Sequence, residues 1–173
     1  MCMRNINTNV VFADIVPNKN GNGIFSLQNV GKKFTVVEQD GKKKITTLSM
    51  ALLISASEER NNESKFDETT FTIDKNYEIR VRLTETYSGS FIDLATIVIE
   101  PSKTVEERGI CKKSYNHTQL CYFNDISLPP DENNKNKYVI KIVLRATDSI
   151  ANGDGKFFVQ SIHPVDFIEP FSK

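Results

Sequence analysis

The stretch Tyr77-Glu78-Ile79-Arg80-Val81-Arg82-Leu83-Thr84 alternates apolar and polar side chains at every step. Successive side chains of a β-strand point to opposite faces of the sheet, so the apolar residues would share one face and the polar residues the other. Antiparallel sheets commonly bury one face and leave the other in water. The stretch therefore predicts a strand of an antiparallel sheet with a core on one side only.

The same alternation recurs in the segment 138–145, whose inward set would be Tyr138, Ile140, Ile142 and Leu144. Its outward set contains Val139 and Val143, so we expect part of that outer face to be covered. The segment 91–99 is apolar on both faces apart from two polar residues, which is typical of a strand in the middle of a sheet.

Turn residues separate these segments from further strand candidates. The β-branched and aromatic segments predict additional strands at 10–16, 24–30, 34–38 and 157–162. Asp40-Gly41 prefers the left-handed conformation of a tight hairpin turn. Ser88-Gly89 indicates a second hairpin, between the Tyr77 strand and the segment 91–99.

The segment 45–59 fits two secondary structures. Alternate residues are apolar over its second half, as in a strand: Met50, Leu52, Ile54 and Ala56. Another set recurs at helical spacing: Leu48, Ala51, Leu52 and Ser55. We favour a strand because the neighbouring segments are strands.

Together these patterns predict an all-β chain, a single domain over residues 1–173 with roughly nine strands in an antiparallel β-sandwich. A closed barrel is the alternative topology. Two long polar connections are expected, at 58–68 and at 101–119. The second contains Thr104-Val105-Glu106-Glu107, whose capping-box spacing is compatible with one short helical turn.

Two parts of the chain resemble a family of small bacterial and phage proteins. One is Phe12-Ala13-Asp14-Ile15, followed by a Gly/Asn loop and the run Ile24-Phe25-Ser26-Leu27-Gln28-Asn29-Val30-Gly31. The other is Lys137-Tyr138-Val139-Ile140-Lys141-Ile142, followed by a turn and a last strand. The resemblance implies an immunoglobulin-like or C2-like single-domain sandwich, and it implies no catalytic residue.

Composition excludes several classes of protein. Lys+Arg and Asp+Glu both number 22, so the formal net charge is zero, without the positive excess typical of proteins that bind nucleic acid. The lysines at 32–33 and 42–44 indicate a solvated hairpin tip. No apolar run approaches the length of a membrane span, and the first residues lack the apolar region of a secretory signal. With three cysteines, an odd number, we expect free thiols in a cytoplasmic protein.

Catalytic motifs are not evident in the sequence. Only two histidines are present, His117 and His163, and no nucleophile elbow, Walker motif or dinucleotide-binding glycine pattern occurs. Nucleophilic catalysis needs a nucleophile together with a base that activates it. We therefore expect a protein that is not an enzyme and that has no cofactor.

The best candidate for a metal site is the cluster Cys111, His117 and Cys121. Thiolate and imidazole groups suit zinc. The spacing is unfavourable, because zinc motifs usually bring two ligands within two to four residues of each other. The alternative is an ordinary pair of free thiols, one on a loop and one at the start of a strand.

The leading functional hypothesis is a non-enzymatic binding module that acts through a protein partner or by self-association. The connection 101–119 would carry the contact, with Val105, Ile110 and Tyr115 as apolar anchors among charges. A structural component of a phage or secretion-like assembly is the first alternative. A sandwich that binds a small ligand or a metal is the second.

Overall fold

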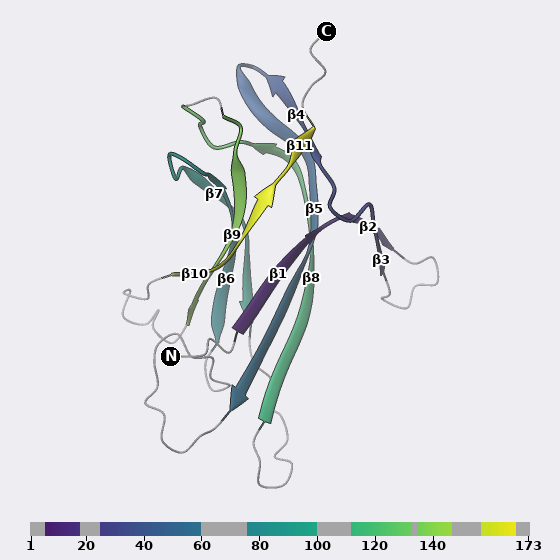
Figure 1. Cartoon of the computed structure of the whole chain (residues 1–173), viewed down its shortest axis with the longest axis vertical. Coiled ribbons are helices and arrows are strands. Elements are labelled where there is room, and N and C mark those ends of the chain that lie inside the picture. Colours follow the sequence, from purple (N-terminus) through teal and green to yellow (C-terminus); the bar gives the residue numbers. More distant parts are fainter. Residues whose placement is uncertain are drawn as a thin grey trace.

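The computed structural model describes residues 6–17, 25–59, 76–99, 112–132, 135–146 and 157–168. These ranges contain eleven strands and no helix (Figure 1). The strands form two main sheets and one small two-stranded sheet. The expected all-β sandwich is confirmed.

The first sheet is organised by β5, an 18-residue strand at Lys42–Glu59. Strand β8 (Lys112–Ser127) pairs antiparallel with β5 from Lys44 to its end. Two strands share the other side of β5: β1 (Ile6–Phe12) pairs with residues 50–56, and β4 (Phe34–Gln39) pairs with residues 42–45. The short strand β11 (Phe167–Ile168) adds parallel to β4.

The second sheet has the order β10-β9-β6-β7, and every neighbouring pair is antiparallel. Its strands are β6 (Tyr77–Glu85), β7 (Phe91–Ile99), β9 (Tyr138–Ala146) and β10 (Phe158–Val165). A turn with Gly89 at φ 73° joins β6 to β7, as the sequence predicts.

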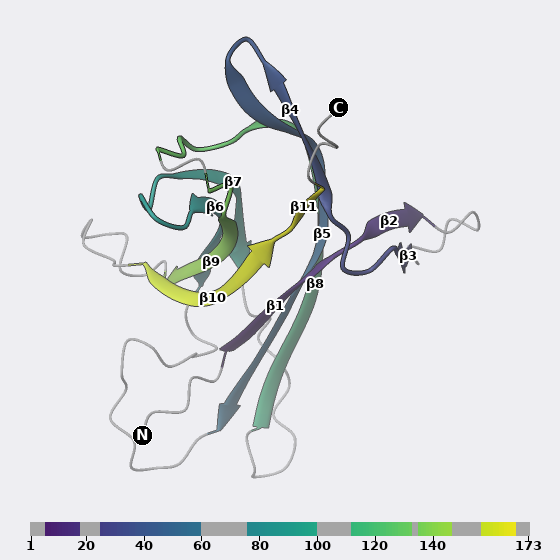
Figure 2. The ribbon, with the colours of Figure 1, turned by 45° about the horizontal axis from the view of Figure 1, so that its top comes forward.

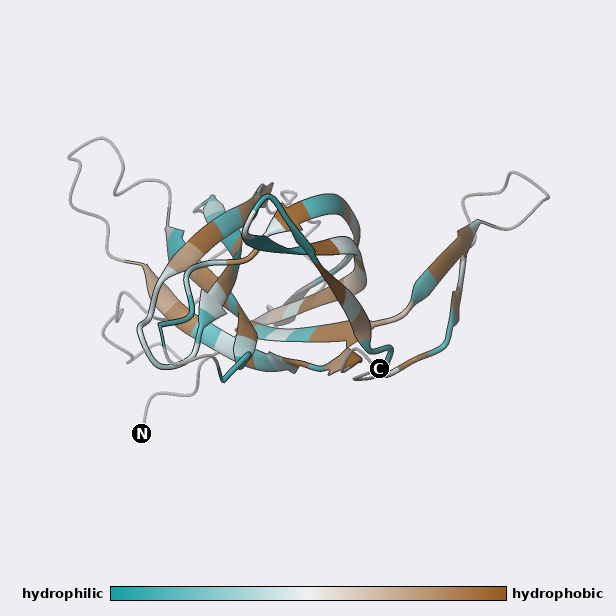
Figure 3. Cartoon of the chain, turned by 90° about the horizontal axis from the view of Figure 1, so that it is seen from above, coloured by the Kyte–Doolittle hydropathy of each residue, from teal (hydrophilic) through white to brown (hydrophobic). Residues whose placement is uncertain are grey.

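The third sheet is a hairpin of β2 (Asp14–Pro17) and β3 (Phe25–Gln28), which projects from the rest of the structure (Figures 1 and 3). Its base is fixed because the Asp14 carboxylate accepts hydrogen bonds from Asn29 and Lys32. The sequence predicts one strand at 10–16, but two are present. The strand is interrupted at Ala13, which is fully buried.

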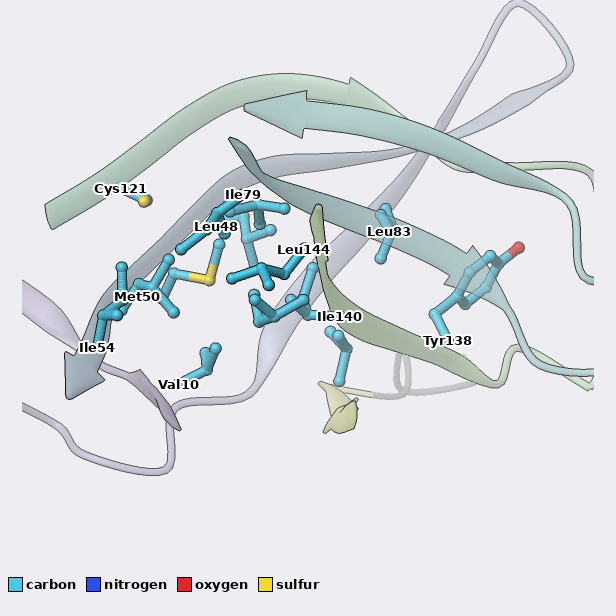
Figure 4. Packing of buried hydrophobic residues seen from close by; sticks show 14 of the residues in the cluster. Val10, Leu48, Met50, Ile54, Ile79, Leu83, Cys121, Tyr138, Ile140 and Leu144 are labelled. Atoms are coloured by element: carbon cyan, nitrogen blue, oxygen red, sulfur yellow. The ribbon is translucent and has the colours of Figure 1, made fainter. Parts of the chain in front are cut away.

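The core lies between the two main sheets (Figure 4). Both alternating segments contribute their predicted inward sets, with Ile79, Leu83 and Ile140 fully buried from the second sheet. Leu48 and Met50 of β5 oppose them from the first sheet. Full burial of one such side chain stabilises the folded state by about 1.5–3 kcal/mol.

The two sheets meet along β1 and β10 (Figure 2). The hydroxyls of Thr8 and Ser161 are hydrogen-bonded at 2.6 Å, and the Gln160 amide donates to the Ile6 carbonyl. Each bond joins one sheet to the other, so this side of the sandwich is closed by side-chain hydrogen bonds rather than by strand pairing.

The outer face of the second sheet carries a network of paired charges. Glu78 accepts hydrogen bonds from Arg80 at 2.7 Å and from Arg145 at 2.8 Å. The Phe157 ring lies 4.5 Å from both of these guanidinium groups. Val143, also on this face, is only 3% exposed, which confirms the expected cover at this position.

Segment 45–59 is a strand throughout, so the favoured alternative is confirmed. The hairpin at Asp40-Gly41 is also confirmed. Both residues have positive φ, 54° and 69°, as the left-handed two-residue turn requires.

Two expectations are wrong. Strand β7 is at the edge of its sheet in the described part of the chain, with β6 as its neighbour, rather than in the middle. Its outer residues Phe91 and Val98 are 51% and 57% exposed. The connection expected at 101–119 is also shorter, because residues 112–119 belong to β8 and pair with β5.

Replacing Leu83 by alanine should lower the free energy of unfolding by about 2–5 kcal/mol, because it leaves a cavity at a fully buried position. Urea unfolding followed by circular dichroism would measure the change. The matched control is Val98→Thr, at an exposed β-strand position, which should alter stability by no more than about 0.5 kcal/mol. Equal losses in the two variants would contradict this placement of the core.

Candidate binding pocket at the end of the sandwich

A pocket of about 780 Å³ lies where the chain passes from the second sheet to the first. Strand β10 ends at Val165, and β11 begins at Phe167 beside β4. The Asp166 carbonyl accepts a hydrogen bond from the Phe34 amide at 2.9 Å, which holds this crossing in place. The volume lies within the range of about 300–1,000 Å³ that is usual for ligand pockets.

Four segments line the end pocket. They are the β4–β5 hairpin, the turn after β6, the start of β9 with the residues before it, and the β10–β11 crossing. Its apolar lining comes mainly from Val36, Val139, Phe167 and Ile168.

Tyr138 supports this lining from inside the core. Its ring packs edge-to-face on Phe167 with the centroids 5.7 Å apart, and its hydroxyl donates to the Pro129 carbonyl at 3.0 Å. Burial, together with the nearby Asp131 and Glu85 carboxylates, raises the pKa of Tyr138 to about 12. The hydroxyl therefore stays protonated at neutral pH and keeps its hydrogen bond.

Three lysines line the pocket as well. Lys43 donates to the Asn136 side-chain oxygen at 2.8 Å, which links the β4–β5 hairpin to the segment before β9. The Lys135 ammonium lies 4.2 Å from the centre of the Tyr87 ring. Lys137 forms no ion pair with any residue that the structure describes.

The turn after β6 is held by a buried carboxylate. Glu85 has no exposed surface, and it accepts hydrogen bonds from the backbone amides of Tyr87, at 2.9 Å, and Ser88. Burial raises the pKa of Glu85, but these hydrogen bonds outweigh it and the net pKa is below the ordinary value. The turn positions Thr86 against the pocket, and the Thr86 amide donates to the Lys137 carbonyl at 2.9 Å.

A second, smaller depression of about 380 Å³ lies on the outer face of β1, β5 and β8. Most of its lining residues are of polar type, and Leu53 is its exposed large apolar side chain, at 38%. It is about half the volume of the end pocket and lies on a different face of the protein, which makes it a suitable control surface.

The predicted metal cluster is not assembled by the residues that are described. His117 and Cys121 share the inner side of β8, but Gln119 lies between them and their backbones are about 13 Å apart along the strand. No group of three or more His, Cys, Asp or Glu residues in the described ranges could hold a metal. Cys111 lies outside these ranges, so the full cluster stays a prediction.

Cys121 is a buried free thiol opposite Met50. Burial raises the pKa of the Cys121 thiol to about 11, which keeps it protonated at neutral pH. The thiolate is the form that binds metal and reacts with electrophiles. In this environment Cys121 behaves as a small apolar core residue.

The predicted partner-binding residues lie away from the end pocket or outside the described chain. Val105 and Ile110 fall outside the described ranges, as does the expected helical turn at 104–107. Tyr115 belongs to β8, where its backbone pairs with Ala56. Their role in binding stays a prediction.

Ser161 and His163 form a pair that sequence reasoning missed. The His163 ring nitrogen Nε2 lies 2.9 Å from the Ser161 hydroxyl, which also contacts Thr8. Both side chains face inward at the junction of β1 and β10, not into the end pocket. Burial lowers the pKa of His163, and within the described ranges no carboxylate hydrogen-bonds to it. The pair therefore fits a structural contact between the sheets.

No protein-family model, curated protein or solved structure matches this chain. In the part of the chain that the structure describes, no helix has the length and apolar character to cross a membrane. The resemblance to small bacterial and phage sandwiches therefore stays a prediction.

Replacing Glu85 by glutamine should destabilise the protein at pH 7, because the neutral amide accepts the two backbone hydrogen bonds less strongly. The folded-state pKa of Glu85 is lowered, so its contribution is present above the ordinary pKa and is lost as the pH falls through the folded value. Urea midpoints of the two proteins should differ at pH 7, and the difference should shrink as the pH is lowered below the ordinary pKa of a glutamate. An unchanged difference across this pH range would contradict the role of the carboxylate.

Cys121 should not react with Ellman's reagent at pH 8 in the native protein and should react after unfolding, because it is buried and protonated. The control is Cys121→Ala, in which the number of thiols that react only after unfolding should fall by one. A loss from the fast-reacting thiols instead would show that Cys121 is accessible.

Proposed function

We propose that this chain is a non-enzymatic binding module that acts through a protein partner, and that the end pocket is the docking site. The observation that carries the proposal is the pocket itself, because it joins an apolar lining to charged groups at the crossing of the two sheets. Apolar anchors that fill a pocket commonly dominate the binding energy of protein interfaces.

The contacts around the end pocket support recognition by a preformed surface. The Phe34–Asp166 hydrogen bond fixes one wall, and the Lys43–Asn136 bond joins the hairpin to another. A site that is ordered before binding loses less conformational entropy when the partner docks.

The groups that line the pocket favour binding over catalysis. They include lysines, two exposed carboxylates, the Asn136 amide and two hydroxyl-bearing residues. Of these hydroxyls, the one on Tyr138 is committed to the Pro129 carbonyl. Nucleophilic catalysis needs a nucleophile hydrogen-bonded to a base, and no such pair is formed by the described residues that line the pocket.

A structural component of a phage or secretion-like assembly is the second candidate, and the β2–β3 hairpin is the observation that favours it. The hairpin projects from the sandwich, and Ile15 pairs with Leu27 on one of its faces (Figure 3). An isolated two-stranded hairpin is marginally stable in water, so packing on a second copy would stabilise it. Ordered oligomers in sedimentation velocity, lost when residues 15–27 are replaced by a short Gly-Ser linker, would favour this candidate.

Ile168→Glu should abolish stoichiometric capture of the protein partner by the tagged chain from lysate of its host. The substitution places a charge in the apolar lining at a residue that is already 46% exposed, so the fold should persist. Leu53→Glu is the matched control on the outer depression, and it should capture the partner like the wild type. The proposal fails if Ile168→Glu still captures the partner, if Leu53→Glu loses it as completely as Ile168→Glu does, or if the wild type captures none.

A further inference from the structure

We infer that the occupant of the end pocket is a segment of the protein partner in which a large apolar side chain lies next to a carboxylate. This inference rests on the proposed function and specifies the chemistry of its ligand. The apolar lining would take the side chain, and the lysines would take the carboxylate.

The charges of the pocket determine the sign of the ligand. Its lining contains three lysines and two carboxylates, Glu38 and Asp166, which leaves an excess of one positive charge. In the chain as a whole the two signs are equal in number. The excess is therefore local to the pocket, and an anionic group would complement it.

Two of the three lysines in the lining have no carboxylate partner among the described residues and can therefore bind an anion. Glu38 lies opposite Lys43 in the register of β4 and β5, so these two charges offset each other across the hairpin. Lys135 and Lys137 lie on the other wall, and no carboxylate of the described chain forms an ion pair with either. Both lysines are exposed, so their ammonium groups are accessible to an anionic group of a ligand.

The apolar residues of the lining indicate that the ligand also carries an apolar group. Val36, Phe167 and Ile168 present carbon surface within the same volume of about 780 Å³. A purely ionic ligand would leave this surface in water, and a purely apolar one would gain nothing from the lysines. A ligand with adjacent apolar and anionic groups satisfies both.

Two fluorescent probes test this chemistry because they differ in one anionic group. One is 8-anilinonaphthalene-1-sulfonate, and the other is N-phenyl-1-naphthylamine, which has the same rings without the sulfonate. The full chain should bind the sulfonate probe about fivefold more tightly at low salt, the upper end of what an exposed ion pair contributes. Fluorescence titration at low salt would measure both dissociation constants.

Variants assign the preference to the pocket. The double variant Lys135→Ala/Lys137→Ala should remove the preference for the sulfonate probe, whereas Lys135→Arg/Lys137→Arg should keep it. The control is Lys42→Ala, an exposed lysine of the same hairpin as Lys43 that does not line the pocket. It should bind both probes like the wild type.

The captured partner completes the test. It should displace the sulfonate probe, and the double alanine variant should capture it at least about fivefold less tightly. Equal binding of the two probes would overturn the inference while leaving the proposed function in place. A partner that is captured without displacing the probe, or a sulfonate preference with no captured partner, would overturn both the inference and the docking site.

Discussion

The length of β5 is the constraint on which the rest of the structure depends. With 18 residues, β5 is long enough to pair with two shorter strands on one side. Strand β1 pairs with one end of β5, and strand β4 pairs with the other end. Strand β8 matches it almost from end to end on the other side. Because β1 and β4 divide β5 between them, the first sheet continues beyond the part of the core that β1 covers, and the β4–β5 hairpin extends from the end of the sandwich (Figure 1).

That extension creates the end pocket. The chain leaves the second sheet at Val165 and joins the first sheet at Phe167, so a single residue, Asp166, spans the crossing. The hairpin stands over one side of this crossing, and the segment before β9 stands on the other, with the Lys43–Asn136 hydrogen bond between them. The pocket is a consequence of sheet switching, and its walls are held by backbone hydrogen bonds at Asp166 and Lys137 together with the side-chain hydrogen bond between Lys43 and Asn136.

The alternation of apolar and polar residues predicted well which side chains are buried, but it predicted poorly which strands are neighbours in a sheet. The inward sets of β6 and β9 lie in the core because the two-residue period reports directly which face is apolar. The position of β7 could not be predicted, because an apolar outer face is also compatible with a strand at the edge of a sheet. In addition, the pairing of β6 with β7 shifts register between Val81 and Arg82, and both Leu94 and Ala95 therefore pack toward the core.

The pocket could not be predicted either, because its residues come from four separated segments. Asp40-Gly41 and the nearby lysines were the only local signals for it.

The two charged regions of the molecule differ in a way that bears on function. On the outer face of the second sheet, Glu78 and Asp93 each accept hydrogen bonds from two arginines, and Phe157 covers two of the guanidinium groups. These charges satisfy one another within the fold. The lysines of the end pocket lie beside apolar surface, and Lys137 has no carboxylate partner in the described ranges. Lys135 and Lys137 are exposed and no carboxylate of the described residues pairs with either, so both can reach an anionic group. The pocket, rather than the arginine network, is therefore where recognition by an anionic partner is expected.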